Sequence, residues 1–164
     1  MTPGARSQED RGATPGRPAF TYRHTVGFAD TNLVGNVYYA HLVAWQGRCR
    51  ELFLKEHLPE VLDELGRDLR LVTLRTSCDF FDELAAFDEV EIRMRLAHVR
   101  GHRIGLDFEY LVDRDGALVI AAAGFQEVGC LRRSGGGFTP SDPPATLLAA
   151  LKPFSGGKLS DGNA

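Results

Sequence analysis

FADTNLVGNVYYAHLVAW, residues 28–45, is the most informative stretch of this chain. Within it, a polar loop that contains glycine runs directly into a helix. The first N–H groups of a helix have no partner inside the helix and carry partial positive charge. Such a junction can stabilise negative charge that develops on a carbonyl oxygen. The stretch therefore predicts a site for acyl transfer.

The helix predicted after this loop continues to Leu58, because Pro59 ends the pattern. One face is apolar at helical spacing, at Tyr38, Leu42, Trp45, Cys49, Leu52 and Phe53. Further apolar residues fall on its other sides, at Ala40, Val43, Ala44 and Leu54. A helix that is apolar around most of its circumference has to be buried on several sides. We therefore expect other elements to wrap it.

Strand patterns precede and follow the helix. The predicted strands are residues 21–28, 69–81, 89–99, 103–112 and 117–131. The third and fourth alternate between apolar and polar side chains, as half-buried strands do. Turn signals join the last three as hairpins. These patterns predict the α+β class, with a curved antiparallel sheet wrapped around one long central helix.

The segment DTNLVGNVYYA (30–40), followed by WQGRCRELFL (45–54), resembles the 4-hydroxybenzoyl-CoA thioesterase branch of the hotdog superfamily. It resembles more closely the thioesterases that act beside the iterative polyketide synthases of enediyne biosynthesis. The resemblance covers residues 20–133, and its specific part is 28–54. It implies a hotdog fold and hydrolysis of a β-keto polyene thioester that is carried on an acyl carrier domain.

The loop departs from the general thioesterase pattern at one position. In that branch the loop carries Asp-x-Asp, and the second Asp acts as nucleophile or general base, whereas this chain has Asp30-Thr31-Asn32. A carboxamide cannot take a proton near neutral pH. The enediyne members share the Asn. The resemblance therefore implies that Asn32 orients the thioester or an attacking water, and that the backbone N–H of Tyr39 polarises the thioester carbonyl.

The resemblance also points to Arg50, as a polar group near the reaction centre. Eleven residues after Tyr39, it lies about 16 Å further along the helix axis. It therefore contacts a distal part of the acyl chain, acts through a second subunit, or is structural. Tyr38, Thr73 and His41 are substrate-binding candidates. Their simpler interpretations are core packing for Tyr38, solvent exposure for Thr73, and packing at a dimer surface, rather than a general base, for His41.

Asp30 is most simply a loop carboxylate that accepts hydrogen bonds from nearby backbone N–H groups. No spacing pairs His24 or His41 with a carboxylate, which a hotdog dehydratase would require. With no titrating side chain assigned to the reaction, the sequence predicts a rate profile without an acidic limb. Two alternatives stay open, namely a general acyl-CoA thioesterase and a non-catalytic acyl-thioester-binding protein in which Asn32 is the relic of a lost carboxylate.

The chain of 164 residues is long enough for one domain with a substantial core. Residues 1–19 are predicted to be a disordered N-terminal tail, 20–133 the hotdog domain, and 134–164 a flexible C-terminal tail with a short helix at 145–151. The N-terminal tail lacks the apolar stretch of a secretory signal, and no segment reads as a membrane span. A cytoplasmic location is therefore expected.

Three cysteines form no CxxC motif and no metal spacing, which predicts reduced, buried thiols and no metal site. No glycine-rich phosphate loop is present, so no nucleotide cofactor is expected. A net charge of −3 gives no reason to expect nucleic acid binding.

Two kinds of protein partner are predicted. Basic residues gather on the later strands and their turns, at Arg93, Arg95, Arg100, His102, Arg103, Arg132 and Arg133. They form either a solvated face or a docking surface for an acidic acyl carrier domain. Because one hotdog subunit leaves a sheet edge open, we expect a homodimer at least and a homotetramer as the usual form.

Overall fold

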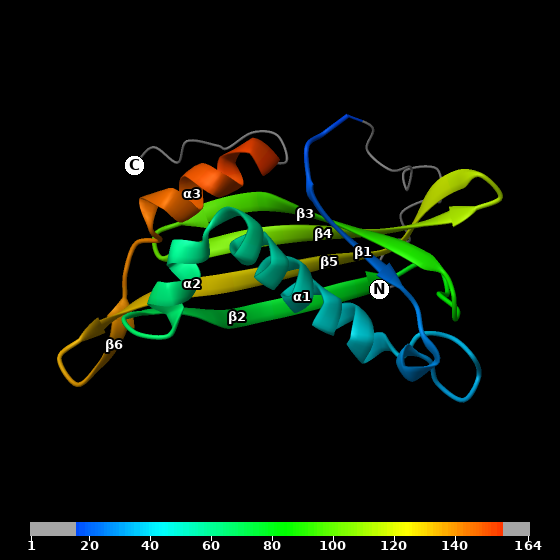
Figure 1. The fold of residues 1–164 in the computed structure, drawn as a ribbon, viewed down its shortest axis with the longest axis horizontal. Helices are drawn as coiled ribbons and strands as arrows, with labels where there is room; N and C mark the ends of the chain where they lie inside the picture. The colour runs from blue at the N-terminus through cyan, green and yellow to red at the C-terminus, as the bar shows by residue number, and fades with distance from the viewer. Residues whose placement is uncertain (1–15, 156–164) are drawn as a thin grey trace, which may run out of the picture.

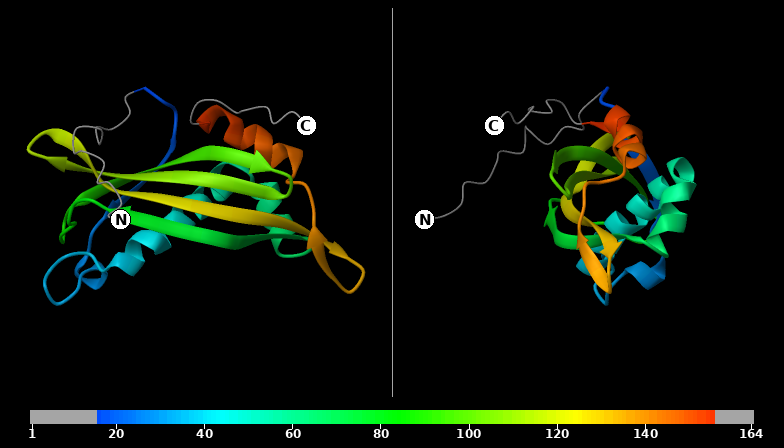
Figure 2. Two further views of the ribbon diagram at one scale, coloured as in Figure 1. Left: turned by 180° about the vertical axis from the view of Figure 1, so that it is seen from behind. Right: turned by 90° about the vertical axis from the view of Figure 1, so that its left-hand side faces the viewer.

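The computed structural model describes residues 16–155. One six-stranded antiparallel sheet curves around a long helix, α1 (Tyr39–His57), as Figures 1 and 2 show. The strands are β1 (Phe20–Thr25), β2 (Leu69–Phe80), β3 (Glu89–Arg100), β4 (Arg103–Arg114), β5 (Ala117–Ser134) and β6 (Gly137–Pro140). The predicted α+β class and hotdog arrangement are confirmed.

The strand order is β1-β3-β4-β5-β2, with β6 paired to the end of β5. In the central strands, alternate side chains face α1 and are fully buried, among them Ile92, Met94, Phe108 and Tyr110. β2 has a neighbour on one side only, and its residues 73–77 are exposed. The sheet therefore ends in an edge strand with unpaired backbone groups.

α1 packs on the sheet with Leu42, Trp45, Cys49 and Phe53, all buried. In the single chain α1 is wrapped less completely than expected, because Ala40 and Ala44 are exposed. The predicted core position of Tyr38 is also wrong, since this residue precedes the helix as its N-cap and is 46% exposed. One flank of α1 is thus open along its length.

Two local predictions need correction near the ends of α1. The candidate first strand stops at Thr25, and residues Phe28–Asp30 form a 3-10 turn, η2. After α1, a second helix that the sequence did not predict, α2 (Pro59–Leu65), follows directly, and a turn at residues 66–68 leads from it to β2. Pro59 ends one helix and begins the next, because the first helical position does not need an N–H donor. Val61 anchors α2 in the core.

The prediction of a flexible C-terminal tail from residue 134 is wrong for its described part. β6 extends the sheet, and α3 (Ala145–Leu151) forms at the predicted residues. Leu147 and Leu151 of α3 are buried at 3% and 2% exposure, so the core reaches beyond residue 133. A 3-10 turn, η3 (Lys152–Phe154), follows α3. Most of the predicted N-terminal tail (1–15) and the last residues of the C-terminal tail (156–164) lie outside the described residues.

In the described part of the chain, no helix is both long enough and apolar enough to cross a membrane.

Candidate active site

The loop that carries Asn32 is held by its own hydrogen bonds. Asn32 N–H donates to Asn36 O (2.8 Å) and Gly35 N–H donates to Asn32 O (3.0 Å), while the Asn32 side-chain oxygen Oδ1 accepts from Val34 N–H (3.0 Å). Gly35 has φ +93°, a conformation that favours glycine. Among residues 16–155, Nδ2 of Asn32 has no partner. The exposed carboxamide thus presents its NH₂ group outward from a fixed loop.

The connection between β2 and β3 supports this loop from the side. Val37 N–H donates to Leu84 O (2.7 Å), and Asn36 forms an isolated bridge with Ala85. Arg114, at the end of β4, holds the connection through an ion pair with Asp88 (3.0 Å). The position of the Asn32 loop therefore depends on residues more than fifty positions away in the chain.

The start of α1 offers unpaired donors. Tyr38 is the N-cap and provides no side-chain cap. No acceptor for the N–H groups of Tyr39 and Ala40 is found within the described residues. These donors, at the positive end of the helix dipole, have the character of an oxyanion hole. Tyr39 is 58% exposed, and the centroid of its ring lies 4.6 Å from that of the Tyr38 ring.

Asp30 brings two histidines to this end of α1. Its Oδ2 atom accepts from Gly27 N–H (2.9 Å), which agrees with the predicted local role, and also lies 2.9 Å from Nε2 of His24. Its Oδ1 atom lies 3.5 Å from Nδ1 of His41. Burial opposes ionisation, but the bonds from Gly27 and His24 and the nearby His41 hold the pKa of Asp30 below its usual value. The spacing of these residues in the sequence did not predict that Asp30 lies beside either histidine.

Arg50 lies toward the other end of α1. Its Nη1 donates to Oε1 of Gln126 (3.2 Å), and no carboxylate of the described chain lies within ion-pair distance. Burial lowers the pKa of its guanidinium. Within one chain, Arg50 is therefore distant from Asn32 and Tyr39. This separation agrees with the prediction from helical spacing.

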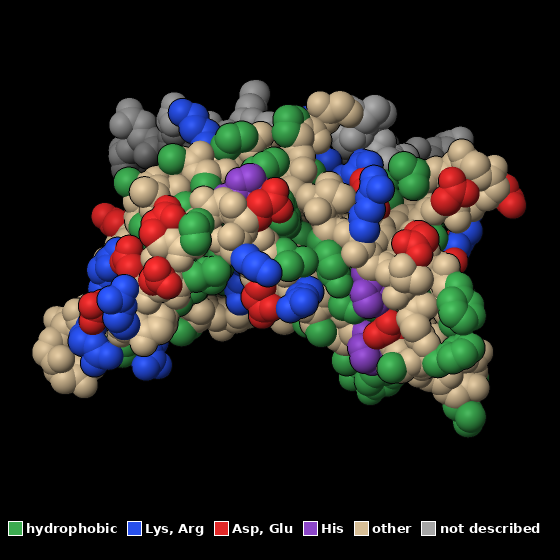
Figure 3. All heavy atoms as spheres, in the orientation of Figure 1, with side chains coloured by type: hydrophobic (Ala, Val, Ile, Leu, Met, Phe, Trp, Pro, Cys, Tyr) green, Lys and Arg blue, Asp and Glu red, His purple; other side chains and the backbone are tan. Residues whose placement is uncertain are grey.

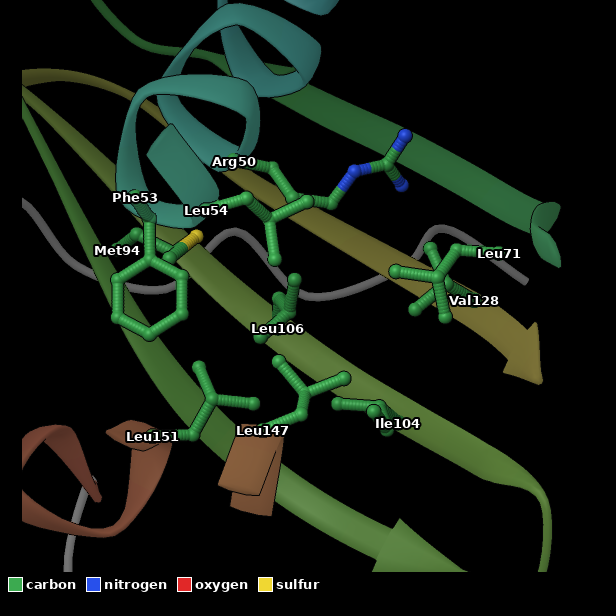
Figure 4. A pocket seen from close by; sticks show the side chains of 10 residues that line it. All are labelled: Arg50, Phe53, Leu54, Leu71, Met94, Ile104, Leu106, Val128, Leu147 and Leu151. Atoms are coloured by element: carbon green, nitrogen blue, oxygen red, sulfur yellow. The ribbon is translucent and has the colours of Figure 1, made fainter. Parts of the chain in front are cut away.

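An apolar cavity of about 20 Å³ lies between α1, α3 and the sheet. Its lining residues are Arg50, Phe53, Leu54, Leu71, Met94, Ile104, Leu106, Val128, Leu147 and Leu151. In Figure 4 the stem of Arg50 lies beside Leu54, and its guanidinium points away from the apolar side chains. A cavity of this volume has room for about one water molecule.

Thr73 lies on a different element from the loop and helix start. It is exposed on the edge strand β2, where the register with β5 shifts after its pairing with Val128. An exposed threonine on an open sheet edge is accessible to a second subunit. The structure of one chain does not bring it to the Asn32 loop.

A buried amide whose role no sequence pattern indicated links α1 to the edge strand. Gln46 is fully buried, and its Oε1 accepts from the hydroxyl of Thr76 while its Nε2 donates to Ser77 O, both at 3.0 Å. A Cβ on Gly124 would lie 2.9 Å from Cδ of Gln46, so only glycine leaves room for this amide. The one feature of the sequence that could have indicated this buried amide is the presence of a glutamine within the apolar stretch of the helix.

The cysteines do not form a nucleophile. Burial raises the pKa of Cys49 to about 12 and those of Cys78 and Cys130 to about 11. Their thiolate forms are therefore scarce at neutral pH. No cluster of potential metal ligands occurs within residues 16–155.

Most of the predicted basic residues are neutralised by carboxylates. The ion pairs are Arg93–Glu91 and Arg95–Glu109 (2.6 Å each), Arg132–Glu64 (2.9 Å), and Arg103–Glu127 and Arg133–Asp68 (3.2 Å each). Beside α2, a groove of about 470 Å³ is lined by Arg50, Arg67, Arg70 and Arg133, together with Glu51 and apolar residues. Figure 3 shows lysine and arginine side chains gathered over α2 and β6.

Comparison with known proteins gives a consistent result. The sequence profile of the thioesterase-like superfamily matches residues 26–151. A crystal structure of the dynemicin thioesterase, from work on polyene binding, has 46% identity and a TM-score of 0.80, and the match covers 84% of this chain and 98% of that one. None of the curated proteins matches the chain.

Two more distant structures show the fold alone. A variant of 4-hydroxybenzoyl-CoA thioesterase, bound to 4-hydroxybenzoyl-CoA, has 13% identity and a TM-score of 0.72, over 81% of this chain and 98% of that one. The 1,4-dihydroxy-2-naphthoyl-CoA thioesterase from Synechocystis has 22% identity and a TM-score of 0.68, over 82% and 96%.

Proposed function

Because the chain belongs to the thioesterase-like superfamily and is a thioester hydrolase, we propose that it releases a β-keto polyene chain from the acyl carrier domain of an iterative enediyne polyketide synthase. The observation that carries this proposal is the 46% identity to the dynemicin thioesterase, over 98% of that protein. The Asn32 loop supports it, since this chain and the enediyne members that it resembles have a carboxamide in place of a carboxylate.

The proposed reaction centre is the junction of the Asn32 loop with α1. The free N–H of Tyr39 binds the carbonyl oxygen as negative charge develops, and such a donor is worth about 3 kcal/mol in the transition state. The outward NH₂ group of Asn32 orients the thioester. Tyr38 and His41 border the same junction. Neutral donors suffice to polarise a thioester that its own β-keto group already activates.

We assign the apolar region between α1 and α3 to the distal acyl chain. Its lining is hydrocarbon apart from Arg50, which has no carboxylate partner in the described chain. The cavity of about 20 Å³ is too small for a polyene, so Leu147 and Leu151 of α3 have to move when the chain enters. Arg50 then contacts the distal chain rather than the thioester.

We propose that the active form is at least a dimer, with a tetramer as the usual form. β2 is an unpaired edge, and pairing it with the same strand of a second copy removes that edge. At the tip of the Asn32 loop, Leu33 and Val34 are 104% and 81% exposed. Burial of such side chains against a second subunit is favourable. Thr73 on β2 then faces the shared interface.

The carrier domain is proposed to dock at the groove beside α2. Arg67 and Arg70 line this groove and form no ion pair within the described residues, so both are available to an acidic partner. The sequence had pointed to Arg100, Arg103, Arg132 and Arg133, but all of these except Arg100 are paired with carboxylates of the same chain.

One experiment tests the function. The purified protein is mixed with an acyl carrier domain loaded with a β-keto polyene, and the released acid and its decarboxylated ketone are measured. The same chain on CoA is measured in parallel. We expect faster release from the carrier. Equal or faster hydrolysis of the CoA thioester would favour a general acyl-CoA thioesterase, and tight binding without release would favour a non-catalytic binder.

A further inference from the structure

Hydrolysis requires that the attacking water lose a proton, and neither Asn32 nor the N–H of Tyr39 can accept one. At the same end of α1, two residues after Tyr39, lies His41. Its Nδ1 is 3.5 Å from Oδ1 of Asp30, and its side chain is 37% exposed. Within residues 16–155, Nε2 of His41 has no partner. One ring nitrogen thus faces a carboxylate while the other is open to solvent.

His24, the other histidine beside Asp30, has partners at both ring nitrogens. Nε2 of His24 is 2.9 Å from Oδ2 of Asp30, and Nδ1 is 3.1 Å from the hydroxyl of Tyr22. Its ring packs against Trp45, with 4.5 Å between ring centroids. Both of its nitrogens are occupied, so it cannot take a proton from water. Its bond, together with that of Gly27 N–H, fixes Oδ2 and leaves Oδ1 of Asp30 for His41.

The charged and titratable groups around His41 come from three elements. Asp30 of η2 is the direct partner, His24 of β1 lies across the same carboxylate, and the phenols of Tyr38 and Tyr39 border the start of α1. Because the pKa of Asp30 is lowered, this carboxylate is charged at neutral pH. A charged acceptor at Nδ1 favours the tautomer that keeps Nε2 unprotonated and able to act as a base.

We propose that His41, oriented by Asp30, is the general base of this hydrolase. The inference rests on the proposed thioesterase reaction at this junction. Nε2 of His41 takes a proton from water as the water oxygen bonds to the thioester carbon, and the carbonyl electrons move to the oxygen held by Tyr39 N–H. When the C–S bond breaks, the imidazolium returns that proton to the thiolate. The products are the free acid and the thiol.

The test is the pH dependence of kcat, from pH 5 to 9, for a medium-chain β-ketoacyl N-acetylcysteamine thioester. The wild-type protein should lose activity at low pH along an acidic limb. His41→Gln should lower kcat about a hundredfold or more and remove that limb, with KM little changed. In His41→Ala, added imidazole should restore part of the rate. An acidic limb would contradict the profile without one that the sequence predicts.

Three further variants separate this role from a structural one. Asp30→Asn should lower kcat, because an uncharged amide no longer favours the tautomer that leaves Nε2 of His41 unprotonated. His24→Gln should keep the limb. His57→Gln is the matched control, since His57 lies at the far end of α1 with a similar side-chain exposure of 35%; it should leave both rate and limb unchanged.

The outcomes are distinct. A wild-type profile that is flat at low pH, or a His41→Gln protein that keeps both its rate and its limb, would overturn the inference while leaving the thioesterase function standing. Absence of hydrolysis of any thioester by the wild-type protein would overturn the proposed function and the inference with it. Thermal melting of each variant shows whether a lost rate reflects unfolding.

Discussion

Replacing Gly124 with alanine should destabilise the protein strongly, although it adds only one methyl group. The new Cβ would lie 2.9 Å from Cδ of Gln46, would collide with Nε2 of the same residue, and would lie 3.4 Å from Ser77 O. Gln46 is fully buried, so its amide has no solvent into which it can move. The change therefore disrupts the packing of Gln46 of α1 against β2 and β5.

The magnitude follows from two costs. Overpacking a close-packed site costs about 1–3 kcal/mol. Displacing the Gln46 amide breaks its bonds to Thr76 and Ser77, and a buried polar group left without its partner costs about 1–3 kcal/mol. We expect Gly124→Ala to lower the free energy of unfolding by about 2–6 kcal/mol, the sum of these two ranges.

Urea denaturation measures the effect, and Gly47→Ala is the matched control. A Cβ on Gly47 meets no atom within 4 Å, and this glycine lies inside α1, so alanine there should stabilise the protein by about 0.5–1 kcal/mol. Gln46→Ala in the Gly124→Ala background removes the collision and should recover part of the loss. A Gly124→Ala protein as stable as the wild type, or a double variant with strictly additive losses, would refute the packing argument.

Four further outcomes are expected. Asn32→Ala should lower kcat at least tenfold, an effect of about 1.4 kcal/mol or more, with an unchanged melting temperature; equal turnover would remove Asn32 from the mechanism. Leu147→Ala should cost about 2–5 kcal/mol in urea denaturation and shift hydrolysis toward longer acyl chains, whereas an unchanged chain-length profile would place the acyl chain elsewhere. Burial raises the pKa of Asp88, but hydrogen bonds from Arg114 and from Ala85 N–H more than offset this and hold it below its usual value. The stability it contributes should thus be present at pH 7 and lost as the pH falls below about 4, so the difference in unfolding free energy between wild type and Asp88→Asn should shrink from pH 7 to pH 3. Sedimentation should show a dimer or larger species at micromolar concentration, and a stable, active monomer would contradict pairing through β2.

The sequence predicted the regular elements because their signals are local. α1 and α3 carry helical spacing that the structure reproduces within a residue or two, and β3 and β4 carry the alternation of half-buried strands. α2 was missed, since Pro59 was interpreted as an end and not also as a start. β6 was missed because four residues after a glycine-rich turn carry no recognisable period, and only pairing with β5 makes them a strand.

The fold class, the Asn32 loop, its junction with α1 and, through the resemblance, the thioesterase family were predictable from the sequence, since each is carried by contiguous residues. Which side chains contact one another could be learned only from the folded chain. Asp30, His24 and His41 come from a turn, a strand and a helix, and no spacing relates their positions. Gln46 and Gly124 fit each other across the sheet in the same way. Such contacts depend on how the sheet curves around α1, and that curvature is a property of the packed chain as a whole.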